Sequence, residues 1–283
     1  KDSILWVGTE KQGLFKINQK SQVIKIFSKA NSNLSTDFIT SISELDSTTL
    51  AVGTDGHGLF ILDKKNEKIS KYSNIARNTQ ILNSHSIRTL YKDYQGTLWI
   101  GTYTGGVNIV NPSHNIFSTY YHSGNQPFSL SAKSVISMLQ TNNGDLLLGT
   151  DGGGINVFDF PSKTFKYESA DSKNSKICSN SIKAIYEDRK GNIWVGTYAN
   201  GLCLYKSTGN HSSILNYLKN SSVWSILEDH NGILWFGTLY NGLCMYDPEL
   251  QSIKLYKNDP ENAYSIGNNS INVIYEDSKN RIW

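Results

Sequence analysis

The stretch that decides the fold runs from Gly191 to Gly201 and reads Gly-Asn-Ile-Trp-Val-Gly-Thr-Tyr-Ala-Asn-Gly. Its core, Gly-Thr-x-x-x-Gly, occurs six times without a change in spacing, and successive copies are 45, 48, 48, 47 and 41 residues apart. Self-similarity at such a period is typical of repeat proteins, so we expect six copies of one structural unit. The copies are centred on Gly8, Gly53, Gly101, Gly149, Gly196 and Gly237.

The residues around Gly196 indicate what each unit builds. Short apolar runs, rich in β-branched and aromatic residues and bounded by Gly, Asn, Asp or Ser, lie at 182–186, 193–197, 202–205 and, more weakly, 214–217. Such runs are typical of β-strands, and the links between them are too short for crossover helices. Four antiparallel strands repeated at this period predict an all-β fold, a β-propeller with one four-stranded blade for each repeat.

The two ends of the chain carry incomplete repeats. The first copy lacks an opening strand, whereas residues 270–283 supply an opening strand and part of a second one. We therefore predict that residues 1–283 form a single β-propeller or a fragment of one, with six repeats and a truncated seventh. The C-terminal strand can complete the first blade and close a ring, or the repeats can continue in a longer array.

The composition disfavours two classes of partner and predicts the state of the cysteines. The formal net charge is +3 with no Lys/Arg run, whereas nucleic acid binding needs a concentrated basic face. No apolar segment is long enough to span a membrane, and no signal peptide is recognised. Cys203 and Cys244 occupy the same place in successive repeats, too far apart for a bridge. We therefore expect Cys178, Cys203 and Cys244 to be free thiols, buried in the core.

Two recurring features concern packing. A Trp two places before Gly-Thr is expected to wedge between neighbouring blades. A Ser/Leu motif before most opening strands is expected to dock the loop, but it is missing before Val223, where the step shortens to 41 residues. This shortening predicts a notch in the rim beside Trp224. The recurring tryptophans are Trp6, Trp99, Trp194, Trp235 and Trp283.

The candidate ligand site is predicted from the loops. In a propeller, the links between second and third strands and the links between blades emerge on one face, where function usually resides. Aromatic planes with carboxylates, amides and cations suit a polar ligand with apolar faces, such as a sugar. The alternative is that loop tips are polar simply because they are exposed. The candidates are Tyr103, Tyr198, Tyr240 and Trp224 for stacking, and Asp55, His57, Asp151, Arg88 and Lys183 for polar contacts.

The sequence disfavours catalysis, a metal site and a cofactor. Glycoside hydrolysis by paired acids needs two carboxylates about 5 to 10 Å apart, and Asp55 and Asp151 are expected to stand two blades apart. Turns such as 188–191 resemble the Asp-box of sialidases, but their Asp-to-Gly spacing differs, which favours a structural turn. The six histidines show no paired ligand spacing. No catalytic residue, metal ligand or cofactor is predicted.

The composite pattern Ser-Leu-Ser-x-x-Ser-Ile, then Tyr-Glu-Asp-x-x-Gly-x-Ile-Trp-Val-Gly-Thr-x-x-x-Gly-Leu, resembles the two-component-regulator propeller repeat. The clearest copies are 181–202, 222–243 and 86–107. The resemblance implies the periplasmic sensor region of a bacterial hybrid two-component histidine kinase, with two seven-bladed propellers and a β-sandwich before a membrane helix. It also implies oligosaccharide ligands and control of polysaccharide-utilisation genes. The family's ligand contacts are not part of the motif, so none is transferred to this sequence.

The expected function is a non-catalytic, periplasmic, carbohydrate-binding sensor domain in signal transduction. Its expected partners are an oligosaccharide and the neighbouring propeller and β-sandwich of the same full-length protein, with a homodimer left open and no nucleic acid. The alternative is a propeller scaffold that only mediates protein–protein docking. A propeller glycoside hydrolase or lyase is disfavoured further.

Overall fold

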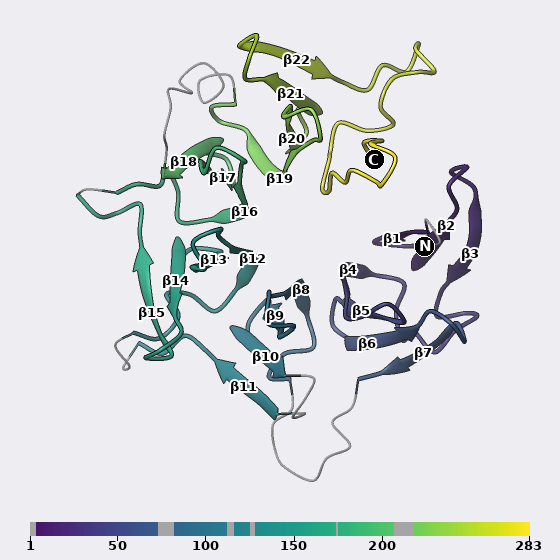
Figure 1. The fold of residues 1–283 in the computed structure, drawn as a ribbon, viewed down its shortest axis with the longest axis horizontal. Helices are drawn as coiled ribbons and strands as arrows, with labels where there is room; N and C mark the ends of the chain where they lie inside the picture. The colour runs from purple at the N-terminus through teal and green to yellow at the C-terminus, as the bar shows by residue number, and fades with distance from the viewer. Residues whose placement is uncertain (1–3, 73–81, 112–115, 125–127, 174, 207–217) are drawn as a thin grey trace. The chain divides into compact units, whose positions relative to one another are not determined.

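The computed structural model describes residues 4–72, 82–111, 116–124, 128–173, 175–206 and 218–283 (Figure 1). Within these ranges the chain is all-β, and its strands form six antiparallel sheets. The predicted fold class, a β-propeller with six blades, is confirmed. No helix in the described ranges is long and apolar enough to cross a membrane. The chain divides into two compact units, Lys1–Ile136 and Ser137–Trp283.

The first unit contains three blades, in each of which neighbouring strands pair in chain order. Among the described residues, the first blade consists of β1 (Leu5–Gly8), β2 (Leu14–Ile17) and β3 (Val23–Phe27). The second consists of β4 (Ile39–Glu44), β5 (Thr49–Thr54), β6 (Gly58–Asp63) and β7 (Lys68–Lys71). The third consists of β8 (Ile87–Lys92), β9 (Leu98–Thr102), β10 (Val107–Asn111) and β11 (Ile116–Tyr120).

The second unit contains the other three blades, the first of which opens with a strand that straddles the division. That fourth blade consists of β12 (Val135–Gln140), β13 (Leu146–Thr150), β14 (Ile155–Asp159) and β15 (Thr164–Glu168). The fifth consists of β16 (Ile182–Glu187), β17 (Ile193–Thr197) and β18 (Leu202–Lys206), and its predicted fourth strand at 214–217 lies outside the described residues. The sixth consists of β19 (Ser222–Glu228), β20 (Leu234–Leu239), β21 (Leu243–Asp247) and β22 (Ser252–Tyr256).

The Thr of Gly-Thr-x-x-x-Gly closes the hairpin between the second and third strands. In all six copies its Oγ1 donates a hydrogen bond to the carbonyl oxygen of the closing Gly, at distances from 2.6 to 2.9 Å. Because the hydroxyl satisfies a backbone acceptor inside the turn, it stabilises one loop shape regardless of the three residues between. The motif therefore holds a constant frame around variable side chains.

The two glycines of the motif are required for different reasons, as the fifth blade shows. A Cβ atom on Gly196 would lie 2.6 Å from the carbonyl oxygen of Val223 in the next blade, so this Gly permits close approach of neighbouring sheets. Gly201 has a φ of 77°, and a Cβ there would lie 2.3 Å from the carbonyl oxygen of Leu218. The first Gly thus serves packing between blades, and the second serves the turn.

The predicted tryptophan wedge is confirmed where it is best developed. Trp194 is fully buried, and its ring lies 5.7 Å from the ring of Phe236 in the next blade. Trp99 is also buried, whereas Trp283 near the C-terminus is 39% exposed. The wedge therefore helps to build the apolar core between neighbouring blades.

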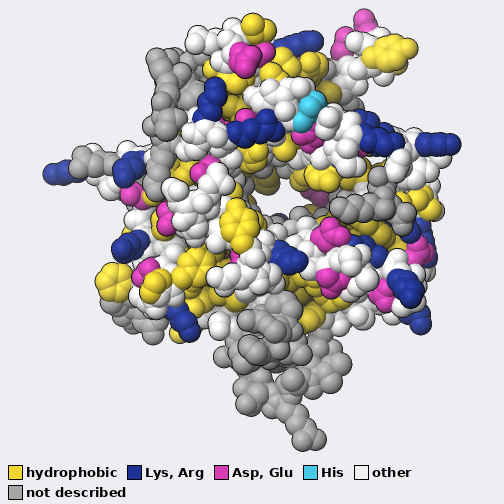
Figure 2. Space-filling model, in the orientation of Figure 1, with side chains coloured by type: hydrophobic (Ala, Val, Ile, Leu, Met, Phe, Trp, Pro, Cys, Tyr) yellow, Lys and Arg dark blue, Asp and Glu magenta, His cyan; other side chains and the backbone are white. Residues whose placement is uncertain are grey.

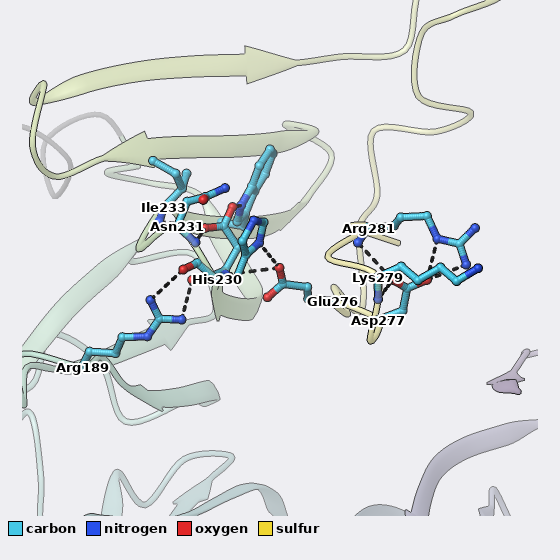
Figure 3. A network of polar contacts seen from close by, with 10 residues as sticks. Arg189, His230, Asn231, Ile233, Glu276, Asp277, Lys279 and Arg281 are labelled. Atoms are coloured by element: carbon cyan, nitrogen blue, oxygen red, sulfur yellow. Dashed lines mark hydrogen bonds and ion pairs between the residues drawn. The ribbon is translucent and has the colours of Figure 1, made fainter. Parts of the chain in front are cut away.

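Three glutamates in the second unit each bond a turn of the preceding blade: Glu187 and Glu228, which end β16 and β19, and Glu276 in the C-terminal segment. Glu228 accepts a hydrogen bond from the backbone N–H of Arg189 at 2.8 Å, and Glu276 accepts one from that of His230 at 3.2 Å. Figure 3 shows Glu276 beside His230, and the Nδ1 of His230 also contacts the Glu276 carboxylate. It also shows the Arg189 guanidinium, which donates hydrogen bonds to the backbone carbonyl oxygens of Asp229 and His230. Glu187 makes the equivalent bond with the N–H of Asn142. These glutamates are therefore structural links on the side of the strands away from the Gly-Thr hairpins.

The prediction of three free thiols is wrong for two of the cysteines. Cys178 and Cys203 form a disulfide with a Cα–Cα distance of 6.1 Å, within the range that a bridge requires. The loop before β16 folds over the next hairpin, so that the Nδ2 of Asn200 donates to the carbonyl oxygen of Cys178 at 2.9 Å. This docking brings Cys178 to β18, a contact that comparison of successive third strands does not reveal. Cys244 is free and buried, as predicted.

Candidate functional site

One residue near the start of the opening strand differs in type from blade to blade, and it lies in a β-bulge. In four blades the register with the second strand shifts at this position, between Ile39 and Ser41, Ile87 and Thr89, Ile182 and Ala184, and Val223 and Ser225. The residues in these bulges are Thr40, Arg88, Lys183 and Trp224. Bulges leave one residue out of the ladder and redirect its side chain, and they are common beside functional sites.

In the second unit, the bulges bring four of the candidate residues together in what we call the Lys183 cluster: Asp151, Lys183, Tyr198 and Trp224. The Nζ of Lys183 lies 3.2 Å from an Asp151 carboxylate oxygen and 5.6 and 5.5 Å from the ring centroids of Tyr198 and Trp224. The Lys183 side chain is only 8% exposed. An ammonium group held between two aromatic faces and a carboxylate is stabilised by charge pairing and cation–π attraction.

The Lys183 cluster also contains an unused hydrogen-bond donor. The Nε1 of Trp224 is buried and has no hydrogen-bond partner, although a buried indole N–H usually has one. The side chain of Ser181 donates to the Asp151 carboxylate, which further fixes that group. The cluster therefore combines a buried N–H that has no partner, a largely buried ammonium group and the half-exposed ring of Tyr198.

The first unit repeats part of this arrangement. The guanidinium carbon of Arg88 lies 4.5 Å from the ring centroid of Tyr103, and the Arg88 Nε is buried without a partner. Arg88 and Tyr103 hold the same places in their blade as Lys183 and Tyr198 do in theirs. Among the described residues, the other buried side-chain atoms without a partner are Thr40 Oγ1 and Ser137 Oγ, both in opening strands. Unsatisfied buried groups are costly, so their concentration at these positions indicates a site that a ligand can complete.

The remaining predicted residues lie on the Gly-Thr hairpins without joining a cluster. Asp55 follows Thr54 at the end of β5, and the Nδ1 of His57 lies 3.1 Å from the carbonyl oxygen of Asp55. Tyr240 is 74% exposed and has a φ of 77°, a left-handed conformation that is rare for an aromatic residue. The structure thus groups Asp151, Lys183, Tyr198 and Trp224, and pairs Arg88 with Tyr103. It leaves Asp55, His57 and Tyr240 separate from them.

Two further residues were not among the predicted ligand contacts. Ser181 bonds the Asp151 carboxylate, and Thr40 is a bulge residue with an unpartnered hydroxyl oxygen. Ser181 stands in the Ser-rich loop motif, where a sequence pattern gives no sign of a side chain directed at the previous hairpin. Thr40 holds the same place as Arg88 and Lys183, so its position in the repeat was the available signal.

The charges around these clusters are mixed. On the face drawn in Figure 2, Lys and Arg side chains are interspersed with Asp and Glu side chains and do not gather into one basic patch. Nucleic acid binding relies on a concentrated basic surface. Among the residues that the structure describes, no group of three or more His, Cys, Asp and Glu side chains could hold a metal ion.

Known proteins resemble both the repeats and the fold. Residues 81–104, 176–199 and 217–240 match the family model described as two component regulator propeller. A comparison with curated protein sequences returns no significant match.

Solved structures extend the resemblance to the whole chain. The extracellular domain of the hybrid two component system BT3049 from B. thetaiotaomicron is 23% identical, with a TM-score of 0.79, and the match covers 100% of this chain and 37% of that one. The extracellular domain of BT4673 from B. thetaiotaomicron is 27% identical, with a TM-score of 0.59, over 99% of this chain and 37% of that one. This chain thus spans little more than a third of the length of either structure. It carries the two component regulator propeller repeat and has the fold found in extracellular domains of two component systems.

Proposed function

We propose that this chain is a non-catalytic, extracytoplasmic sensor region that recognises oligosaccharides. It acts within a hybrid two component system that controls polysaccharide-utilisation genes, and its location is the periplasm. The observation that carries the ligand class is the Lys183 cluster, in which a buried, unpartnered indole N–H lies beside an ammonium group and an exposed aromatic ring.

The chemistry of this cluster suits a sugar. A sugar ring has an apolar C–H face that stacks on an aromatic side chain such as Tyr198, and hydroxyl oxygens around its edge that accept hydrogen bonds. Trp224 Nε1 and Lys183 Nζ supply donors for such oxygens, and Asp151 supplies an acceptor for a hydroxyl. Placing these groups on bulges and hairpins of rigid blades fixes their positions before the ligand arrives, which lowers the entropy cost of binding.

Two further observations support the biological setting. The match to the regulator repeat and the extracellular origin of the structural neighbours favour a signalling role outside the cytoplasm. The Cys178–Cys203 disulfide favours an oxidising compartment. In this proposal, a bound oligosaccharide favours one arrangement of the propeller against the neighbouring propeller and β-sandwich of the full-length protein, and the signal follows from that shift.

The proposed absence of catalysis is supported by the composition of the Lys183 cluster. The Asp151 carboxylate is paired with Lys183 and accepts a hydrogen bond from Ser181, and it is the one carboxylate of the cluster. Glycoside hydrolysis by paired acids needs two carboxylates about 5 to 10 Å apart.

The test is calorimetric titration of the 283-residue chain with oligosaccharides released from plant, algal and animal polysaccharides. Wild type is expected to bind at least one of them, and Tyr198→Ala and Trp224→Phe are each expected to weaken that binding about tenfold, the value of one ring contact or hydrogen bond. Tyr264→Ala is the control, because Tyr264 is 99% exposed and lies outside the cluster. Unchanged affinity in both cluster variants would overturn the site assignment.

The competing function is docking to another protein. It is favoured by the outer strand β3, where Val23 and Ile24 are about half exposed and the edge pairs with no further strand among the described residues. A scaffold of this kind would bind no oligosaccharide, so the same titration separates the two functions.

A further inference from the structure

The fifth and sixth blades, both in the second unit, differ at two pairs of equivalent residues. In the fifth blade, the docked loop places Cys178 against Asn200 and Cys203 of the hairpin. In the sixth blade, Asn241 and Cys244 hold the equivalent places, but Asn241 Nδ2 instead donates to Ser221 Oγ at 3.0 Å, and Cys244 has no bridge.

A pocket of about 260 Å³, which we call the notch pocket, lies beside the hairpin of the sixth blade. Trp224 is not among its described lining residues, so the notch predicted beside Trp224 stays a prediction. The pocket's polar lining residues have hydroxyl, amide or ammonium groups, and none of its described lining residues is acidic. The two lysines are exposed and therefore available to a ligand. The lining residues are Leu218, Lys219, Ser221, Thr238, Asn241, Leu255 and Lys257.

A second pocket in the same unit has the opposite character. It lies at the turns on the other side of the strands, with a volume of about 290 Å³, and four carboxylates and one ammonium group line it. The carboxylates belong to Asp188, Glu228, Asp247 and Glu249, and the ammonium group to Lys190. Of these two pockets, the notch pocket is the cationic one beside the variable hairpins and the other is the acidic one at the turns, so the notch pocket is the one that suits an anion.

Tyr240 is an exposed aromatic residue that adjoins the notch pocket in the chain. It directly precedes Asn241 and holds the place that Gly56, Gly152 and Ala199 occupy in other blades, where φ is also positive. An aromatic residue at a φ of 77° is strained, whereas Gly would not be. Since Tyr240 is 74% exposed, burial does not account for its presence, but stacking on a ligand would.

We propose that the notch pocket and Tyr240 form a subsite for an anionic sugar residue, a uronate or a sulfated sugar. Lys219 and Lys257 bind the acid group, Asn241 and Ser221 bind hydroxyls, and the sugar face stacks on Tyr240. The subsite rests on the proposed function, because it assigns the ligand class of the same hairpin face.

The experiment measures binding of paired oligosaccharides to the 283-residue chain. The pairs are tetragalacturonate with its carboxyl-reduced form, and a κ-carrageenan tetrasaccharide with its desulfated form, within a wider panel of acidic and neutralised glycans. Wild type is expected to bind an acidic member about tenfold more tightly than its neutral partner, with a preference that falls as salt rises. The pair that shows the preference distinguishes a uronate from a sulfate.

Variants then assign the preference to the pocket. Lys219→Gln combined with Lys257→Gln is expected to remove the preference, whereas Lys190→Gln, in the acidic pocket, leaves it unchanged. Tyr240→Gly is expected to weaken binding without lowering the melting temperature, since Gly relieves the strained φ. Binding of glycans without a charge preference, or a preference that survives the double lysine variant, would overturn this inference and leave the proposed function intact. Failure to bind any glycan would overturn both.

Discussion

The indole nitrogen of Trp194 donates a hydrogen bond of 2.8 Å to the Oδ2 of Asp188, six residues earlier. The other oxygen of the same carboxylate accepts the backbone N–H groups of Lys190 and Asn192. One buried side chain therefore holds both the turn and the core tryptophan of its blade. The same bond joins Asp93 to Trp99, Asp229 to Trp235 and Asp277 to Trp283.

Removing this carboxylate should destabilise the second unit more than removing the indole donor. Asp188→Ala leaves several buried donors without an acceptor and is expected to lower the free energy of unfolding by about 2 to 4 kcal/mol. Trp194→Phe removes one donor and keeps a ring in the core, so about 1 to 2 kcal/mol is expected. Urea unfolding followed by circular dichroism measures both. Equal stability of Asp188→Ala and wild type would contradict the structural role.

The hairpin glycine can be tested against a matched turn glycine. Gly191 and Gly201 have φ values of 79° and 77°, but a Cβ on Gly191 would meet nothing within 4 Å, whereas one on Gly201 would meet a carbonyl oxygen. Gly191→Ala is expected to cost about 1 kcal/mol from backbone strain alone. Gly201→Ala is expected to cost clearly more, because the backbone must also move. Identical melting temperatures for the two variants would show that the contact between a Cβ at position 201 and the carbonyl oxygen costs no stability.

The disulfide predicts a stepwise exposure of thiols. Burial raises the pKa of the Cys244 thiol to about 12, so this group should not react with a thiol reagent in the folded chain at neutral pH. Unfolding without reductant should release the one thiol of Cys244, and reduction should release the other two. Mass spectrometry of alkylated protein counts them. Three reactive thiols in the unreduced, unfolded chain would exclude the Cys178–Cys203 bridge.

An ion-pair network in the first unit predicts a dependence of stability on pH. The ammonium groups of Lys16 and Lys25, 2.6 and 2.7 Å from the Glu67 carboxylate, lower its pKa from 4.5 to about 2. Because the folded-state pKa is the lower one, the stabilisation is present above about pH 4.5 and is lost as the pH falls towards 2. Glu67→Gln should therefore match wild type at pH 2 and be less stable at pH 6.

The measurement for this network is the melting temperature across that pH range. Glu261→Gln, at an exposed position of the other unit, serves as the control and should keep the wild-type profile. A Glu67→Gln profile parallel to wild type at every pH would mean that the ion pairs contribute nothing.

The sequence predicted the blades because each one repeats its own boundary signals. Gly-Thr-x-x-x-Gly fixes a hairpin through the Thr hydroxyl and two glycines, which is why copies without the tryptophan, at Ala51 and Leu147, still form regular blades. The shortened step before Val223 predicted a notch beside Trp224, and this stays a prediction because much of the link lies outside the described residues.

The sequence did not predict features that depend on contacts between blades. The Cys178–Cys203 bridge needs the docked path of a loop, and the Glu228 link needs the offset between neighbouring sheets. The bulges arise from local twist of the strands, and no particular residue type marks them. Their positions were marked only by the change of residue type from blade to blade, as at Lys183 and Trp224. The sequence could therefore predict that the candidate side chains lie on one face of the blades, but not which of them contact one another.

The most direct test of the proposed function follows the indole N–H signals of the six tryptophans by nuclear magnetic resonance. Trp99, Trp194, Trp235 and Trp283 have bonded indoles, whereas the Trp224 N–H has no partner. Addition of a bound oligosaccharide should shift the Trp224 signal, assigned through its loss in Trp224→Phe, and leave those four in place. An oligosaccharide that binds without moving the Trp224 signal would contradict the account.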